Sequence, residues 1–389
     1  GESAEVAVPK LIEVLGDDAG LEGDETFTLD LSHETNVTLA AASAIGTILD
    51  DGDFNGYQWN VDADGNWDTA SNWLPQGVPA SDERVLLGSV ITAPRTITLP
   101  GNRGVSGIVF DSPHGYTLTG NEFAVGLVGP GQHLYVYSGD HLIEDDFKNN
   151  ENGGLAVDVA DGASLVMAKR FYATHYGRSF YRKSGQGTLQ VLGLTQSIGY
   201  RGLAIQGGVL RTEGGYRQLT DDKNVSVSSG ATWGLGGTVD GDTGVTDLPN
   251  LDLNGTLDPI GTATWNADDV NMADAEALDF ELGMSSDTLI LNMSPYDAAV
   301  TLTGPSSAGQ TDLNLTAGPG FGAGTYDLLD WSGSTNIVVS GLDLADFNVN
   351  APAGRQVILK FDNGVPSADA GTTKLQVEIV PAGSLFQIY

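Results

Sequence analysis

The stretch Lys183–Gly215 constrains the fold of this chain more than any other part of the sequence. It reads KSGQGTLQVLGLTQSIGYRGLAIQGGVLRTEGG, in which short apolar runs are separated by turns marked with glycine. Within each run apolar and polar residues alternate with a period of two, which is typical of a β-strand. The runs follow one another too closely for a crossover helix to join them. Such strands bury their apolar face only when copies stack, so the pattern predicts the coils of a β-solenoid.

The same stretch resembles the autotransporter-associated β-strand repeat. The pattern of that repeat is G-x-G-T-L-x-L-x-G, then a small turn, then I-x-x-G-x-L and a closing glycine. Its first half is matched by Gly185, Gly187, Thr188, Leu189, Val191 and Gly193, and its second half by Ile205, Gly207, Gly208, Val209 and Leu210. The resemblance implies a solenoid of a bacterial surface protein.

Composition places the whole chain in the all-β class. Glycine accounts for 53 of the 389 residues and charged residues for only 17%. Only Ala273–Leu282 looks briefly helical. We therefore expect an all-β protein with a β-helix-like, extended β-solenoid over 56–320. A partial β-sandwich is expected over 1–53, and a C-terminal β region with an apolar tail over 321–389.

The charge and the missing cysteines exclude several partners and chemistries. The net charge of −34 at pH 7 argues against nucleic acid and against an anionic membrane surface as a partner. No apolar stretch reaches the length of a membrane-spanning helix, so we expect no membrane insertion. Without cysteine the chain has neither a disulfide framework nor thiol chemistry.

The first 53 residues are strongly acidic, with 13 acidic residues against one lysine. The pieces GES, LEGDETFTLDLS and GTILDDGD occur here in that order. In this the segment resembles the second half of a Calx-beta domain, a calcium-binding β-sandwich module. The first strands of such a module are absent from this chain.

The Calx-beta resemblance implies a calcium site. In that family, acidic residues from loops at one end of the sandwich surround calcium, which takes oxygen ligands. The residues that match are Asp17, Asp18, Glu22 and Glu25 around one loop, and Asp50, Asp51 and Asp53 at the end of another. Calcium is therefore the expected cofactor. The alternative is that these acids are solvated turn residues.

Half of the six tryptophans lie within Gly56–Gly88, at Trp59, Trp67 and Trp73. This segment resembles the opening of bacterial surface solenoids. One interpretation is that the rings cap the first coil and prevent its open edge from pairing. The other is that they form a stacking platform for carbohydrate.

A basic and aromatic stretch stands out in this acidic chain. Nine of the 17 Lys and Arg residues fall within 169–223, which begins KRFYATHYGRSFYRK. Surfaces that combine rings and cations are enriched at interface cores. The residues expected at an interface are Arg170, Tyr172, Tyr176, Arg178, Tyr181, Arg182 and Lys183. Their expected partner is an acidic protein surface or an acidic glycan, and the alternative is a solvated face.

The tail PAGSLFQIY is a strand-forming segment without an obvious place in the solenoid. Its apolar residues Leu385, Phe386, Ile388 and Tyr389 are expected at an interface. A sandwich without its first strands exposes unpaired backbone, which the tail of the next copy could satisfy by strand addition. Donor and acceptor differ, so the contact would propagate as a polymer. The alternative is that the missing strands belong to a separate piece.

Together these features predict a structural subunit of an extracellular or cell-surface assembly, such as a filament, sheath or surface layer. The first alternative is a calcium-dependent adhesin that binds glycans. The second is a β-helix enzyme acting on polysaccharide, for which Asp145 and Asp146 beside Lys148 could be considered. The sequence has no nucleophile elbow and no phosphate-binding glycine loop, so we do not expect an enzyme.

Overall fold

The computed structural model describes residues 25–30, 43–48, 54–126, 133–149, 155–173, 181–197, 202–218, 224–241, 250–266, 269–292, 300–307, 310–334, 337–368 and 371–380. The chain divides into two compact units, Gly1–Asn55 and Gly56–Tyr389. In the first unit β1 (Glu25–Asp30) pairs with β2 (Ser43–Ile48) in antiparallel orientation. These are the described strands of the segment for which the sequence predicts a partial sandwich.

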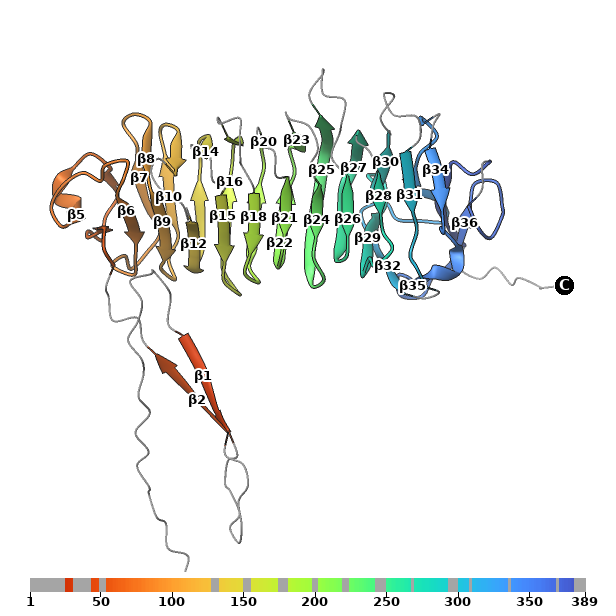
Figure 1. Ribbon diagram of the computed structural model, residues 1–389, viewed down its shortest axis with the longest axis horizontal. Coiled ribbons are helices and arrows are strands. Elements are labelled where there is room, and N and C mark those ends of the chain that lie inside the picture. The colour runs from red at the N-terminus through yellow and green to blue at the C-terminus, as the bar shows by residue number, and fades with distance from the viewer. Residues whose placement is uncertain are drawn as a thin grey trace, which may run out of the picture. The chain divides into compact units, whose positions relative to one another are not determined.

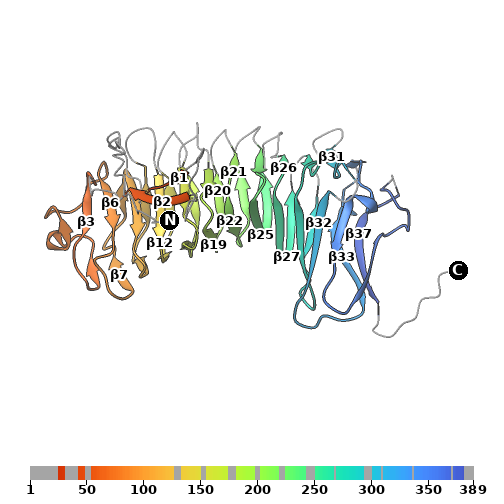
Figure 2. The ribbon, with the colours of Figure 1, turned by 90° about the horizontal axis from the view of Figure 1, so that it is seen from below.

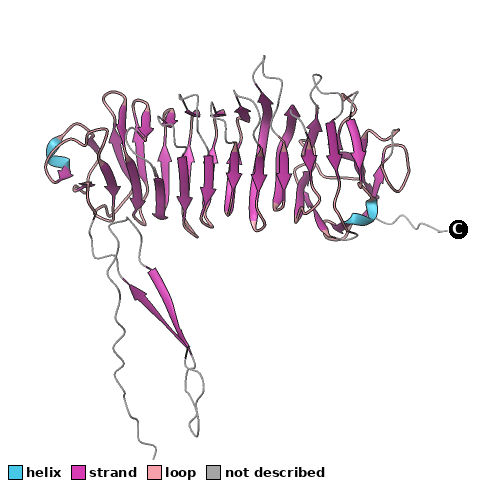
Figure 3. Cartoon of the chain, viewed as in Figure 1, coloured by secondary structure: helices cyan, strands magenta, loops and turns pink. Residues whose placement is uncertain are grey.

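The second unit is a β-solenoid, which confirms the predicted fold class. Almost every described element in it is a strand, and the coils follow one another along a single direction (Figures 1 and 3). Most strands pair in parallel with the equivalent strands of the preceding and following coils. The result is three parallel ladders that surround one core.

Ladder 1 consists of β4 (Gly65–Asn66), β7 (Arg95–Thr98), β10 (Tyr116–Thr119), β13 (Asp140–Ile143), β16 (Ser164–Met167), β19 (Thr188–Val191), β22 (Gly208–Thr212), the first part of β25 (Ala231–Gly241) and of β27 (Thr256–Asn266), β29 (Ala277–Leu282), β32 (Thr311–Ala317) and β35 (Phe347–Asn350). Ladder 2 consists of β8 (Arg103–Val105), β11 (Phe123–Val125), β14 (Phe147–Asn149), β17 (Phe171–Ala173), β20 (Thr195–Ser197), β23 (Tyr216–Gln218), the second part of β25 and β27, β30 (Thr288–Leu291) and β33 (Gly324–Asp330). Ladder 3 consists of β3 (Tyr57–Trp59), β6 (Arg84–Leu87), β9 (Gly107–Asp111), β12 (His133–Ser138), β15 (Leu155–Val159), β18 (Tyr181–Ser184), β21 (Leu203–Ile205), β24 (Val225–Val227), β26 (Leu251–Leu253), β28 (Val270–Asn271), β31 (Val300–Thr303) and β34 (Ile337–Ser340).

The alternation seen in the sequence places one side of each strand in the core. In ladder 1, Leu165, Leu189, Leu210 and Trp233 stand in register in successive coils, and all four are buried. Each inward side chain therefore packs on the same position of the coils on either side. Burial of such columns supplies the main stabilising free energy of the solenoid.

The N-terminal end of the core is closed by tryptophans. Trp59, Trp67 and Trp73 are only 2%, 0% and 1% exposed. Trp73 packs edge-on against the other two rings, and its Nε1 donates a hydrogen bond to the carbonyl oxygen of Trp67 at 2.8 Å. Rings that are buried against each other cannot stack on a sugar. The cap interpretation is therefore supported, and the carbohydrate platform is contradicted.

At the C-terminal end the strand pairing changes from parallel to antiparallel. There β37 (Lys374–Val380) pairs with β33 on one side and with β36 (Gln356–Phe361) on the other (Figure 2). These strands belong to the same compact unit as the coils. The boundary expected at residue 321 thus marks a change of pairing within one unit.

The remaining described elements are β5 (Trp73–Leu74), which pairs with β3 in antiparallel orientation, and two short 3-10 helices, η1 (Ala70–Asn72) and η2 (Leu344–Asp346). The segment that looks briefly helical in the sequence contains strand β29 (Ala277–Leu282) instead, which pairs in parallel with β32. Among the described residues no helix is long and apolar enough to cross a membrane.

Glycine at position 187 is required by the close approach of two turns. A Cβ atom placed there would lie 2.1 Å from the carbonyl oxygen of Ala160 in the preceding coil. We expect Gly187→Ala to lower the free energy of unfolding by about 2 kcal/mol or more, because the clash is with backbone. Denaturant unfolding of the full chain measures it. Gly101→Ala is the matched control, since a Cβ there would meet only the tip of Arg103 at 3.4 Å. Equal stability of the two variants would contradict the turn packing.

Candidate functional site

Most of the predicted calcium ligands lie outside the described residues, namely Asp17, Asp18, Glu22, Asp50, Asp51 and Asp53. Glu25 is the first residue of β1, and its backbone is in register with Ile48 of β2. In the part of the chain that the structure describes, no group of three or more metal-ligating side chains occurs. The calcium site therefore stays a prediction.

The predicted basic and aromatic interface is described in part. Tyr176 and Arg178 lie outside the described residues, as do Leu385, Phe386, Ile388 and Tyr389 of the tail. The structure describes Arg170, Tyr172, Tyr181, Arg182 and Lys183. These five residues do not form one surface.

Arg170 and Tyr172 lie on the outer side, where both are bound to acidic side chains of their own chain. Arg170 is paired with Asp146 at 2.8 Å, and its guanidinium carbon lies 3.9 Å from the centre of the Tyr172 ring. The Tyr172 hydroxyl donates a hydrogen bond to Glu122. Partial burial, together with this bond, raises the pKa of Tyr172 to about 12. Their charge and hydrogen-bonding capacity are thus already partly used within one molecule.

Other cations of the basic stretch and its surroundings are paired in the same way. The pairs are Lys148 with Glu122, Lys169 with Asp145, and Arg211 with Asp258. Lys169 and Arg170 each stand 24 residues after their partners, Asp145 and Asp146. This separation is the length of one coil. In the sequence, an acidic pair therefore stands one coil before a basic pair, and this spacing is the signal that could have predicted both contacts. Asp145 and Asp146, the two acids considered for polysaccharide chemistry, are therefore both bound in ion pairs with Lys169 and Arg170.

Tyr181 and Lys183 lie inside the solenoid, so the prediction that they form part of a contact surface is wrong. They are 2% and 1% exposed, and the Tyr181 ring packs on Phe171 with 4.5 Å between ring centroids. The reason is the period of two along β18, which sends these two side chains inward and the intervening Arg182 outward. Counting charges along the sequence missed this alternation.

The ammonium group of Lys183 is held in a cage of backbone carbonyls. Its Nζ donates to the carbonyl oxygens of Ser184, Gly185 and Gly207 at 2.7, 2.9 and 3.1 Å. An ammonium has three donor hydrogens, so the cage satisfies all of them. Burial lowers the pKa of Lys183 to about 8, although the nearby carboxylate of Asp158 favours the charged form. At neutral pH the lysine therefore joins the turns of two successive coils.

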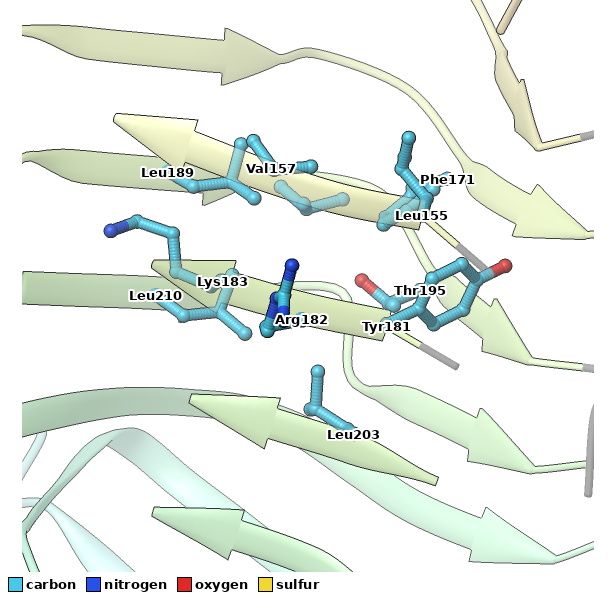
Figure 4. A pocket seen from close by; sticks show the side chains of 11 residues that line it. Leu155, Val157, Phe171, Tyr181, Arg182, Lys183, Leu189, Thr195, Leu203 and Leu210 are labelled. Atoms are coloured by element: carbon cyan, nitrogen blue, oxygen red, sulfur yellow. The ribbon is translucent and has the colours of Figure 1, made fainter. Parts of the chain in front are cut away.

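A small cavity lies in the core beside Lys183 (Figure 4). Its lining residues are Leu155, Val157, Phe171, Tyr181, Arg182, Lys183, Leu189, Val191, Thr195, Leu203 and Leu210. The room for the centre of a water molecule amounts to about 10 Å³, enough for about one water. This is far less than the volume of pockets that hold organic ligands.

The cavity arises where a column of large side chains ends. Phe123, Phe147 and Phe171 stand in register in ladder 2, and the next position is Thr195. Thr195 is 2% exposed, and its hydroxyl has no hydrogen-bond partner among the described residues. Replacing a ring by a threonine leaves both empty space and an unsatisfied polar atom. The arrangement can hold a water molecule, but it offers no room for a substrate.

No protein-family model matches this chain, and no curated protein matches it. The resemblances to a Calx-beta domain and to the autotransporter-associated repeat therefore stay predictions.

The buried amine should give the stability of this protein a particular pH dependence. Because the pKa of Lys183 falls from 10.5 to about 8 on folding, the unfolded chain binds more protons than the folded chain between these pH values. The free energy of unfolding therefore rises with pH in this window. Relative to Lys183→Met, the wild type should gain up to about 3 kcal/mol from pH 8 to pH 10.5.

Denaturant unfolding at several pH values measures this difference. Lys148→Met is the matched control, because Lys148 lies on the outer side and pairs with Glu122. It should keep the pH profile of the wild type. Parallel profiles for the wild type and Lys183→Met would contradict the buried position of the amine.

Proposed function

We propose that this protein is a structural subunit of an extracellular or cell-surface assembly, such as a filament, sheath or surface layer. The observation that best supports this is the continuity of the solenoid. Coil follows coil from β3 to β35, and the described outward side chains bond mostly to neighbouring coils instead of converging on a reactive centre. A stack of this kind suits a rod-like building block, since each coil needs only its neighbours.

The N-terminal unit supplies a reason for assembly. Its described strands, β1 and β2, form a two-stranded sheet. A sheet of two strands is only marginally stable in water without further strands or a packing partner. A strand donated by another copy would extend this two-stranded sheet. Because donor and acceptor are unlike surfaces, the contact propagates as a polymer. The proposed donor is the tail 381–389.

An adhesin that binds glycans is the second candidate, and one observation favours it. Tyr135 and Tyr137 lie on the outward side of β12, partly exposed, with ring centroids 5.6 Å apart and an angle of 19° between the rings. Partly exposed tyrosines can combine apolar contact with a hydrogen-bonding hydroxyl, as a sugar requires. Binding of the full chain to a glycan array, with loss in Tyr135→Ala, would favour this candidate.

Self-assembly is the direct test of the structural role. We expect the purified full chain to form ordered polymers, seen by negative-stain electron microscopy and followed by light scattering. Deleting 381–389 should leave monomers whose thermal unfolding resembles that of the intact chain. The reason is that the proposed tail strand would pair with another copy and contribute nothing to the coils of its own chain.

The two possible failures have different meanings. Polymers that persist in the deletion variant would show that the tail is not the donor. An intact chain that stays monomeric over a range of salt and calcium concentrations would contradict the structural role itself.

Calcium is proposed as the ligand of the N-terminal unit. If Asp50 and Asp51 bind it, Ca²⁺ should raise the stability of this unit by mass action, by about 2.7 kcal/mol at a hundredfold excess over the dissociation constant. Melting scans of the full chain in Ca²⁺ and in chelator measure the shift. The shift should be lost in the double variant Asp50→Asn, Asp51→Asn. Mg²⁺ is the control ion, and identical scans with and without Ca²⁺ would refute the site.

A further inference from the structure

We propose that Arg182 is the contact through which one copy of this chain binds a carboxylate in the acidic N-terminal unit of a second copy. The inference rests on the proposed function, because it names one of the surfaces that the assembly would use. It replaces the broad basic and aromatic interface predicted from the sequence by a single outward cation.

Arg182 differs from the paired cations of the same region. It has no hydrogen bond or ion pair with any residue that the structure describes, whereas Arg170, Lys169 and Lys148 each contact a carboxylate. Its Nε is buried without an acceptor. Leaving such a donor unsatisfied costs about 1–3 kcal/mol, and a carboxylate bound at the terminal nitrogens does not remove this cost. None of the carboxylates that the structure describes is paired with Arg182, and we assign its partner to a second copy of the chain.

The surroundings of Arg182 leave its guanidinium accessible to that partner. The residues in register on the two neighbouring strands are Ala156 and Ala204, whose side chains are small. The carboxylate of Asp158 on the neighbouring strand accepts a hydrogen bond from the Ser184 hydroxyl at 2.6 Å. Only the Nε of Arg182 is enclosed, so the terminal nitrogens can donate two parallel hydrogen bonds to a carboxylate.

Charge complementarity identifies the N-terminal unit as the occupant. The first 53 residues carry 13 acidic residues and one lysine, a net charge of −12. Two acidic copies repel each other at long range, but at physiological salt this repulsion is screened beyond about 8 Å. A direct pair at contact distance is screened much less. Assembly should therefore require moderate salt and still depend on the arginine.

The experiment compares Arg182→Met with Arg170→Met in the full chain. Both changes keep an apolar stem and remove one cation, but Arg170 already has Asp146 as its partner. We expect Arg182→Met to slow polymer growth at least tenfold by light scattering, while its melting temperature stays equal to or above that of the wild type, because a buried unsatisfied donor is removed. Arg170→Met should assemble like the wild type.

The outcomes separate this inference from the proposed function. If Arg182→Met forms polymers as fast as the wild type, the inference alone is overturned. If the wild type never assembles, the proposed structural function is overturned. A third outcome is that Arg182→Met assembles normally but no longer binds an anionic polysaccharide such as polygalacturonate. In that case Arg182 binds a glycan, and the inference is also overturned.

A second measurement keeps the test decisive if Arg182→Met folds poorly. The chain has no cysteine, so Ala156→Cys introduces a single thiol next to an intact Arg182. A photo-crosslinker on this thiol should join it to residues within 1–53 of another copy, as identified by mass spectrometry. Crosslinks in the assembled protein that map to other regions would refute the proposed contact.

Discussion

Parallel stacking in register is the constraint on which this structure depends. Within the stack an inward side chain stands in register with the equivalent residues of the neighbouring coils, as in the column Leu165, Leu189 and Leu210. The hydrogen bonds of three ladders fix the spacing, so neighbours cannot shift to absorb a residue of a different kind. An exceptional residue must therefore be accommodated locally. Lys183 is accommodated by carbonyl oxygens of nearby turns, and Thr195 by a cavity and an unsatisfied hydroxyl.

On the outer side the same stacking would bring like charges close together, and in part of ladder 1 amide side chains stand next to a carboxylate or to each other. In ladder 1 the Asn314 amide donates to Asp279 at 2.7 Å, and the Asn350 amide donates to Asn314 at 2.7 Å. Burial raises the pKa of Asp258, and the nearby Asp279 raises it further. Each exposed pair contributes little by itself. Repeated in many coils, such pairs reduce the repulsion that a strongly acidic surface would otherwise impose on the stack.

The features that could be predicted from the sequence are those with a local cause. Alternation over two residues and glycine at turns predict the strands and the solenoid, and the clash that a Cβ at Gly187 would make explains why the turn pattern demands glycine. Ala273–Leu282 looks helical locally, but the parallel pairing of β29 with β32 overrides that propensity. The contact of Arg170 with Asp146 joins two residues one coil apart. Predicting it requires the number of residues in a coil, which the pattern of a single strand does not reveal.

The three consecutive residues Tyr181, Arg182 and Lys183 show why charge content alone does not identify an interface. In the sequence they form one basic and aromatic cluster. In β18 the ring packs in the core, the ammonium is enclosed by carbonyls, and only the guanidinium between them is outward and without a described partner. What makes a charged residue available for recognition is therefore not its place in a basic cluster, but the absence of a partner at the position where the strand alternation turns it outward.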